Sequence, residues 1–141
     1  MQKGFTLIEL LIVMIIVALL VVVSVPKYKT SMEKARAQEG INNLTLIADQ
    51  ANGYYMMQDG SYLNVQNFLK KGVDKAKSNY FKEPKYRVIA GSRLIISTES
   101  KKAGYTLSIS LMAGQVSARS CAPKSGNETA KRICDAIGWG N

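Results

Sequence analysis

The sequence predicts an α+β fold, in which one long N-terminal helix packs against a small antiparallel sheet. Three patterns lead to this prediction. An apolar run, interrupted by a single charged residue, covers residues 5–25, an apolar stripe at the helical period follows over residues 37–55, and short segments of alternating polarity lie within residues 86–117. The first two patterns belong to one helix, and the third belongs to the sheet.

The apolar run is long enough to cross a membrane. About 21 residues at about 1.5 Å each span roughly 31 Å, which matches the hydrocarbon core of a bilayer. A secretory signal peptide would have a shorter apolar core and a small-residue cleavage site beyond it. Here the run ends in Ser24, Val25 and Pro26 and continues into a polar helical pattern. A plain signal anchor is the alternative to a segment with a further function.

Glu9 places a charge near the start of this apolar run. A carboxylate at membrane depth costs roughly 2.5 to 3.5 kcal/mol on insertion scales, so its presence suggests a function and a partner. The nearest candidate partner is the α-amine that a cut between Gly4 and Phe5 would create. The alternative is a carboxylate that simply reaches toward the membrane surface.

The helix is expected to continue beyond the membrane. Mostly small and apolar residues recur there at spacings of three and four: Ala37, Ile41, Leu44, Ala48, Ala51 and Tyr55. The pattern predicts one helix of about 50 residues, kinked near Pro26, which removes a backbone hydrogen bond. Because the stripe is rich in small residues, a tightly packed sheet is the favoured partner, and a lone coiled coil is the alternative.

Residues 58–141 form the predicted head. A short helix is expected over residues 64–72, capped by Asn64 and stopped by Gly72, with three residues facing inward: Val65, Phe68 and Leu69. Three strands are expected at residues 86–90, 94–98 and 105–112, with a fourth at residues 115–117. A head of this size has too little core alone, so it must bury the stripe of the helix.

The segment Lys3-Gly4-Phe5-Thr6-Leu7-Ile8-Glu9 resembles the class III signal of type IV pilins and of the related pseudopilins of type II secretion. The resemblance implies that a prepilin peptidase removes the leader, residues 1–4, and that Phe5 becomes the N-methylated first residue. It also implies the type IV pilin fold. Residues 5–26 would be the transmembrane and filament-core helix, residues 27–57 its amphipathic half, and residues 58–141 the head.

Gly4 and Glu9 have physical roles in this scheme. A peptidase at the membrane surface needs a residue without a side chain before the cut, because glycine lets two backbones approach closely. After the cut, Glu9 lies one helical turn from the Phe5 amine and is well placed to neutralise the amine of a neighbouring subunit. Such a pair would set the stagger of subunits in a filament.

Cys121 and Cys134 are the two cysteines of the chain. They resemble the pair that bounds an outward-facing loop near the C-terminus of many type IV pilins, where the loop often supports adhesion. A disulfide here would contribute roughly 3 kcal/mol in the loop-entropy model and would place the head in an oxidising compartment. A zinc site and a redox pair are the weaker alternatives, since the chain has no histidine and the spacing is long.

The basic residues after the span oppose this orientation. Lys27, Lys29, Lys34 and Arg36 outnumber the positive charges before the span, and the positive-inside rule then favours a cytoplasmic head. The leader motif and the cysteine pair outweigh this statistical rule, so we expect the leader inside and the head outside.

The chain carries a net charge of +9, and part of the excess is local. Eight basic residues lie close together in the sequence, namely Lys70, Lys71, Lys75, Lys77, Lys82, Lys85, Arg87 and Arg93. Repeated along a filament, they would form a positive surface able to attract DNA or anionic polysaccharide. The favoured alternative is a solvated region that pairs with acidic groups of neighbouring subunits.

The sequence indicates no enzyme and predicts no metal or other cofactor, since it has no histidine, no glycine-rich phosphate loop and no cluster of carboxylates. The resemblance implies a structural subunit: the major pilin of a type IV pilus, held in the bacterial inner membrane and then polymerised by the assembly machinery into an extracellular helical filament. The first alternative is a minor pilin or a pseudopilin of a type II secretion system, located in a periplasmic pseudopilus. The second is a monomeric membrane-anchored module that binds anionic ligands.

Overall fold

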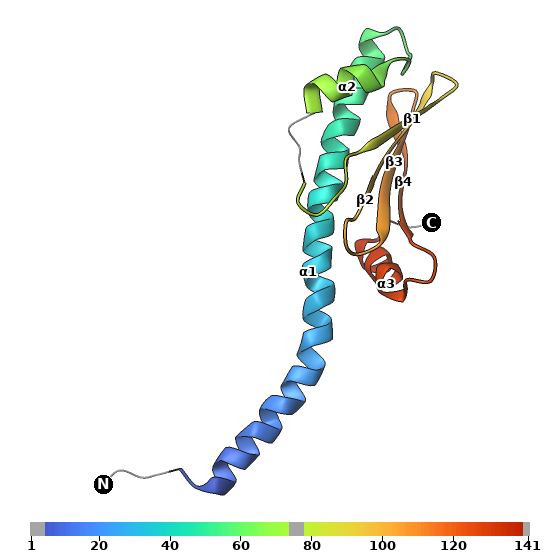
Figure 1. Ribbon diagram of the computed structural model, residues 1–141. Helices are drawn as coiled ribbons and strands as arrows, with labels where there is room; N and C mark the ends of the chain where they lie inside the picture. Colours follow the sequence, from blue (N-terminus) through green and yellow to red (C-terminus); the bar gives the residue numbers. More distant parts are fainter. Residues whose placement is uncertain (1–4, 74–77, 140–141) are drawn as a thin grey trace. The chain divides into compact units, whose positions relative to one another are not determined.

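The computed structural model describes residues 5–73 and 78–139 and confirms the α+β fold (Figure 1). The elements follow the order α1 (Leu7–Met57), α2 (Val65–Val73), β1 (Lys85–Ile89), β2 (Arg93–Glu99), β3 (Tyr105–Met112), β4 (Gln115–Pro123) and α3 (Glu128–Ile137). The chain divides into two compact units, Met1–Met32 and Glu33–Asn141. Helix α1 contributes its first part to one unit and its second part to the other.

The first unit contains the apolar part of α1. The helix has 51 residues in total, as the sequence predicted, and Pro26 lies inside it. The hydroxyl of Thr30 donates to the carbonyl oxygen of Pro26 at 3.2 Å, one turn along the helix. The kink near Pro26 stays a prediction from the chemistry of proline.

The second unit is built on a four-stranded antiparallel meander in the order β1-β2-β3-β4. Register is set by apolar pairs that share one face, such as Leu94 with Leu111 and Ile96 with Ile109. Ala113 and Gly114 join β3 to β4 with φ angles of 51° and 79°. A two-residue hairpin turn with both φ angles positive matches the right-handed twist of its strands.

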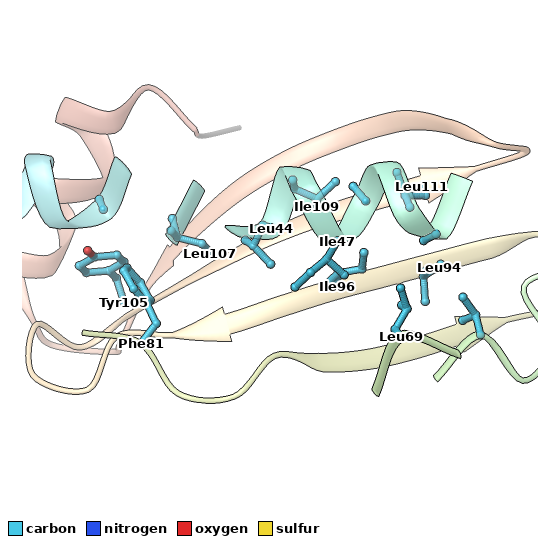
Figure 2. Close-up of a cluster of buried hydrophobic side chains, with 14 of the residues drawn as sticks. Leu44, Ile47, Leu69, Phe81, Leu94, Ile96, Tyr105, Leu107, Ile109 and Leu111 are labelled. Atoms are coloured by element: carbon cyan, nitrogen blue, oxygen red, sulfur yellow. The ribbon is translucent and has the colours of Figure 1, made fainter. Parts of the chain in front are cut away.

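The second half of α1 covers the apolar face of this sheet. Figure 2 shows Leu44 and Ile47 of α1 beside Ile96, Leu107 and Ile109. The predicted stripe is buried at four positions, and two further positions of α1 join it: Ala37, Leu44, Ala48 and Ala51, with Gly40 and Ile47. The small residues of the stripe let the helix lie close to the sheet, as the sequence suggested.

Helix α2 differs in detail from its prediction. Val65 and Leu69 are buried, but Phe68 is 42% exposed and stacks at the surface against Tyr54, with ring centroids 5.0 Å apart. Asn64 has a φ of 64°, unlike the extended backbone of a typical N-cap. The helix also runs through Gly72 to Val73, so Gly72 does not stop it.

The C-terminal part of the chain contains more regular secondary structure than its sequence suggested. Strand β4 continues to Pro123, well beyond the predicted residues 115–117, and residues 128–137 form α3. Asn127 caps this helix, since its side-chain oxygen accepts from the N–H of Ala130 at 2.9 Å. Strand β4 is a largely exposed edge strand without apolar alternation, so hydropathy could not reveal its length.

Candidate functional site

The start of α1 holds the candidate processing and assembly residues. Gly4 lies outside the described residues, and Phe5 is the first residue that the structure describes. The carboxylate of Glu9 accepts hydrogen bonds from both the N–H and the hydroxyl of Thr6, each at 2.9 Å. In return, the N–H of Glu9 donates to the Thr6 hydroxyl oxygen at 3.4 Å.

This reciprocal arrangement is a capping box, which sequence reasoning missed. Its signal is present in the sequence, because Thr6 and Glu9 have the Ser/Thr-x-x-Glu spacing directly before an apolar run. Glu9 therefore has a partner within its own chain. The carboxylate offers about four lone-pair sites and retains capacity for a second partner.

The apolar part of α1 is exposed all round. Every described residue from Phe5 to Met32 is exposed in the isolated chain, and by length and composition this is the one helix among the described residues able to cross a membrane. A continuous apolar surface of this length needs a bilayer or other apolar helices to cover it. The processing motif and this helix together indicate membrane anchoring before assembly.

The two cysteines form a disulfide between β4 and α3, with their Cα atoms 5.4 Å apart. The N–H of Cys121 also donates to the carbonyl oxygen of Trp139, which follows α3. Ala130 and Ile133 are buried on the same side of the helix as Cys134. The C-terminal helix is thus joined to the sheet covalently, by a backbone hydrogen bond and by apolar packing.

Six of the eight basic residues are described, and they lie in different parts of the chain's second unit. Lys75 and Lys77 lie outside the described residues. Lys85, Arg87 and Arg93 lie on the sheet face opposite the core, as the alternation of β1 and its pairing with β2 show. Lys70 and Lys71 lie at the end of α2.

Lys82 is already paired, because its ammonium contacts the carboxylate of Glu99 at 2.8 Å. This hydrogen bond and charge lower the pKa of Glu99. A cavity of about 700 Å³ brings Lys82 together with Lys70 and Lys85, and also with Lys101, which the sequence reasoning did not include. Arg87 and Arg93 do not line it.

Within the described residues, no group of three or more histidine, cysteine, aspartate or glutamate side chains could hold a metal ion.

These features define a protein with an apolar N-terminal helix suited to membrane anchoring and a head in which a helix packs on a sheet. Residues 1–25 match the prokaryotic N-terminal methylation motif. The chain is also similar to the ComG operon protein 3 homolog of Bacillus licheniformis, with 32% identity over 80 residues that cover 51% of this chain and 79% of that relative. The chain belongs to the type IV pilin and pseudopilin family. Members of this family are structural subunits of a pilus or pseudopilus. No solved structure matches the chain.

Proposed function

We propose that this chain is the major structural subunit of a type IV pilus. In this proposal, a prepilin peptidase cuts between Gly4 and Phe5, and the new amine of Phe5 is methylated. The match of residues 1–25 to the N-terminal methylation motif carries the proposal. The subunit is then held in the bacterial inner membrane until the assembly machinery adds it to an extracellular filament.

The exposed apolar helix supports polymerisation. Its side chains are covered by lipid before assembly, and in a filament they would be covered by the same helix of neighbouring subunits. Glu9 would pair there with the Phe5 amine of a neighbour. That pairing offsets the cost of holding each charge in apolar surroundings.

The C-terminal region favours a pilus over a secretion pseudopilus. Major pseudopilins usually carry an acidic calcium loop there and no cysteine pair. This chain has the Cys121–Cys134 disulfide, and Glu128 and Asp135 are its acidic residues after Gly114. A pseudopilin is the second candidate, and one observation favours it. The relative that this chain resembles is named for the ComG operon, and its name mentions no pilus.

Two measurements test the proposal. The N-terminal mass of the native protein should correspond to a chain that starts at Phe5 and carries one extra methyl group. An intact Met1 would refute every function that depends on processing, and it would leave the monomeric anion-binding module.

Imaging of sheared surface fibres then separates the two filament functions. A major pilin should be the main protein of long fibres, and deletion of its gene should remove them. A processed chain that never appears in surface fibres would favour the pseudopilin or a minor pilin. Salt-sensitive binding of purified fibres to DNA would assign a ligand to the basic residues, whereas no binding at low salt would reject that idea.

A further inference from the structure

A small cavity lined by both apolar and charged groups lies in the second unit, where α1 meets the turn between β2 and β3. Its volume is about 100 Å³, and its lining includes Arg36 of α1, Lys101 and Lys102 of the turn, and Tyr105 of β3. One water molecule needs roughly 10 to 15 Å³ of such space. The cavity therefore has room for several waters or for one small ion.

Two buried hydrogen-bond donors lie on this cavity. The side-chain oxygen of Tyr105 and the Nε of Arg36 are both buried, and by strict geometry neither has a hydrogen-bond partner among the described residues. The Ser100 hydroxyl, which also lines the cavity, interacts with the Tyr105 oxygen in a way that lowers the pKa of Tyr105, so it acts there as a donor and leaves the Tyr105 proton without an acceptor. Tyr105 as a whole is only 1% exposed. A buried donor without an acceptor costs free energy, so native structures usually supply one.

The charges around the cavity favour an anion as that acceptor. Burial, assisted by the charge of Glu33, raises the pKa of Tyr105 to about 12, so its hydroxyl keeps its proton and donates at neutral pH. Arg36, Lys101 and Lys102 outweigh the carboxylate of Glu33 among the lining side chains. The guanidinium of Arg36 cannot accept a hydrogen bond, and neither can the two ammonium groups.

Arg36 and Tyr105 are also held in place before any ligand arrives. Arg36 forms an ion pair with Glu33, one turn earlier on α1, and its guanidinium carbon lies 5.0 Å from the centre of the Tyr80 ring. The Tyr105 ring packs edge-on against Phe81, with centroids 6.0 Å apart. Donors fixed in this way lose little freedom on binding.

We propose that this cavity binds one small oxyanion of the carboxylate or phosphate class, which accepts hydrogen bonds from the Nε of Arg36 and the hydroxyl of Tyr105. The anion is either free in solution or a carboxylate on a second copy of this chain. Both sources supply the same oxygen acceptors. The site does not depend on the proposed function, because its residues all belong to the second unit.

The test uses the full chain in detergent micelles, labelled with ¹⁵N at arginine. Inorganic phosphate and acetate are added in separate titrations, and the Nε–H signal of Arg36 is followed by NMR. The Arg36→Lys variant identifies this signal by its loss. We expect a saturable shift, and we expect Tyr105→Phe to weaken binding roughly tenfold, since one hydrogen bond to an anion is lost.

Tyr62→Phe is the matched control. Tyr62 is also a buried tyrosine, but its hydroxyl already contacts Asn52 at 3.2 Å and the N–H of Gly114 at 3.2 Å, away from the cavity. This variant should bind both anions with unchanged affinity. Loss of phosphate and acetate binding in Tyr62→Phe to the same extent as in Tyr105→Phe would overturn the assignment of the site.

Measurements on filaments distinguish the two possible sources of the anion. If a neighbouring copy supplies the carboxylate, the Arg36 signal of washed filaments should already have its bound position. If the source is a free ion, that position should appear only when phosphate or acetate is added. A shift in micelles that grows linearly without saturation, combined with an unshifted signal in filaments, would overturn the proposal and leave water as the occupant.

Discussion

The carboxylate of Glu9 has one interaction in the structure and one in the proposed filament. Within the chain it accepts from the N–H and the hydroxyl of Thr6, and in the filament it would pair with the Phe5 amine of a neighbour. Glu9→Gln separates these roles, because glutamine also serves in capping boxes but carries no charge. We expect this variant to be cleaved and inserted normally but incorporated poorly into fibres, as measured by immunoblot of sheared fibres.

Thr6→Val is the converse control, because it removes the hydroxyl and keeps the charge. Loss of such a cap costs about 0.5 to 2 kcal/mol of helix stability, and the exposed start of α1 should tolerate it. Incorporation of Thr6→Val should therefore exceed that of Glu9→Gln. Normal amounts of fibre built from Glu9→Gln alone would reject the charge pairing.

Gly40 and Gly53 lie in the same helix and should respond to alanine with opposite signs. A Cβ at Gly40 would lie 2.7 Å from the buried ring of Phe81, whereas a Cβ at Gly53 meets nothing within 4 Å. We expect Gly53→Ala to stabilise the protein by up to about 1 kcal/mol through helix propensity. Gly40→Ala should instead lower the free energy of unfolding by about 1 to 3 kcal/mol, because the ring must move.

Denaturant unfolding of the full chain in micelles measures both glycine variants. The same helical gain applies at each position, so the difference between the variants isolates the contact with Phe81. Stabilisation of the protein by Gly40→Ala would contradict the prediction, because it would show that the Phe81 ring moves aside at little cost.

Tyr105 should make stability depend on alkaline pH. The unfolded chain loses the Tyr105 proton near the ordinary tyrosine pKa of about 10, whereas burial raises the pKa in the folded protein to about 12. The folded state therefore binds more protons between these values, and its free energy of unfolding falls as pH rises, by up to about 1.4 kcal/mol per pH unit. Urea unfolding at pH 8, 10 and 11 should show that the free energy of unfolding falls less with pH in Tyr105→Phe than in the unchanged protein. An equal fall in both proteins would contradict the raised pKa of Tyr105.

Strand β4 and helix α3 depend on each other through the Cys121–Cys134 disulfide. Reduction should lower the free energy of unfolding by about 3 kcal/mol in the loop-entropy model. The expected shift is measured by denaturant unfolding with and without reductant. A Cys121→Ser, Cys134→Ser double variant should have the same free energy of unfolding as the reduced protein, and the reductant should not change it. An unchanged midpoint on reduction would mean that packing alone holds α3.

The elements that bury one face were predictable, and those at the edge were not. Residues 105–112 alternate between apolar and polar, and α1 has a stripe of small residues, because these two elements bury one face against each other. Both hydrophobic periods were therefore visible in the sequence. Strand β4 lies at the exposed edge of the sheet, and its polarity carries no period. Helix α3 does have a helical period, since Ala130, Ile133 and Cys134 are buried at spacings of three and four, and the sequence reasoning missed it. The caps at Asn127 and Gly138 mark α3 locally. The cavity beside Arg36 and Tyr105 joins residues far apart in sequence, and no local pattern could reveal it.

At the scale of the whole molecule, the two units differ in how their apolar side chains are covered. The second unit has a buried core shared by the second half of α1, strands β2 and β3, and the helices α2 and α3. The first unit has no buried residue among those described, and an apolar surface of this length needs lipid or other apolar helices to cover it. Membrane orientation therefore decides in which compartment the head folds and oxidises.

We expect the head to lie outside the cytoplasm, against the count of basic residues that follow the span. That count is a statistical rule, and the match of residues 1–25 to the N-terminal methylation motif opposes it. The Cys121–Cys134 disulfide also requires an oxidising compartment. Protease added to cells with a permeabilised outer envelope should digest the head. A maleimide should label the two cysteines only after reduction. A protected head with freely labelled thiols would place it in the cytoplasm, where neither the disulfide nor addition to a surface filament is possible.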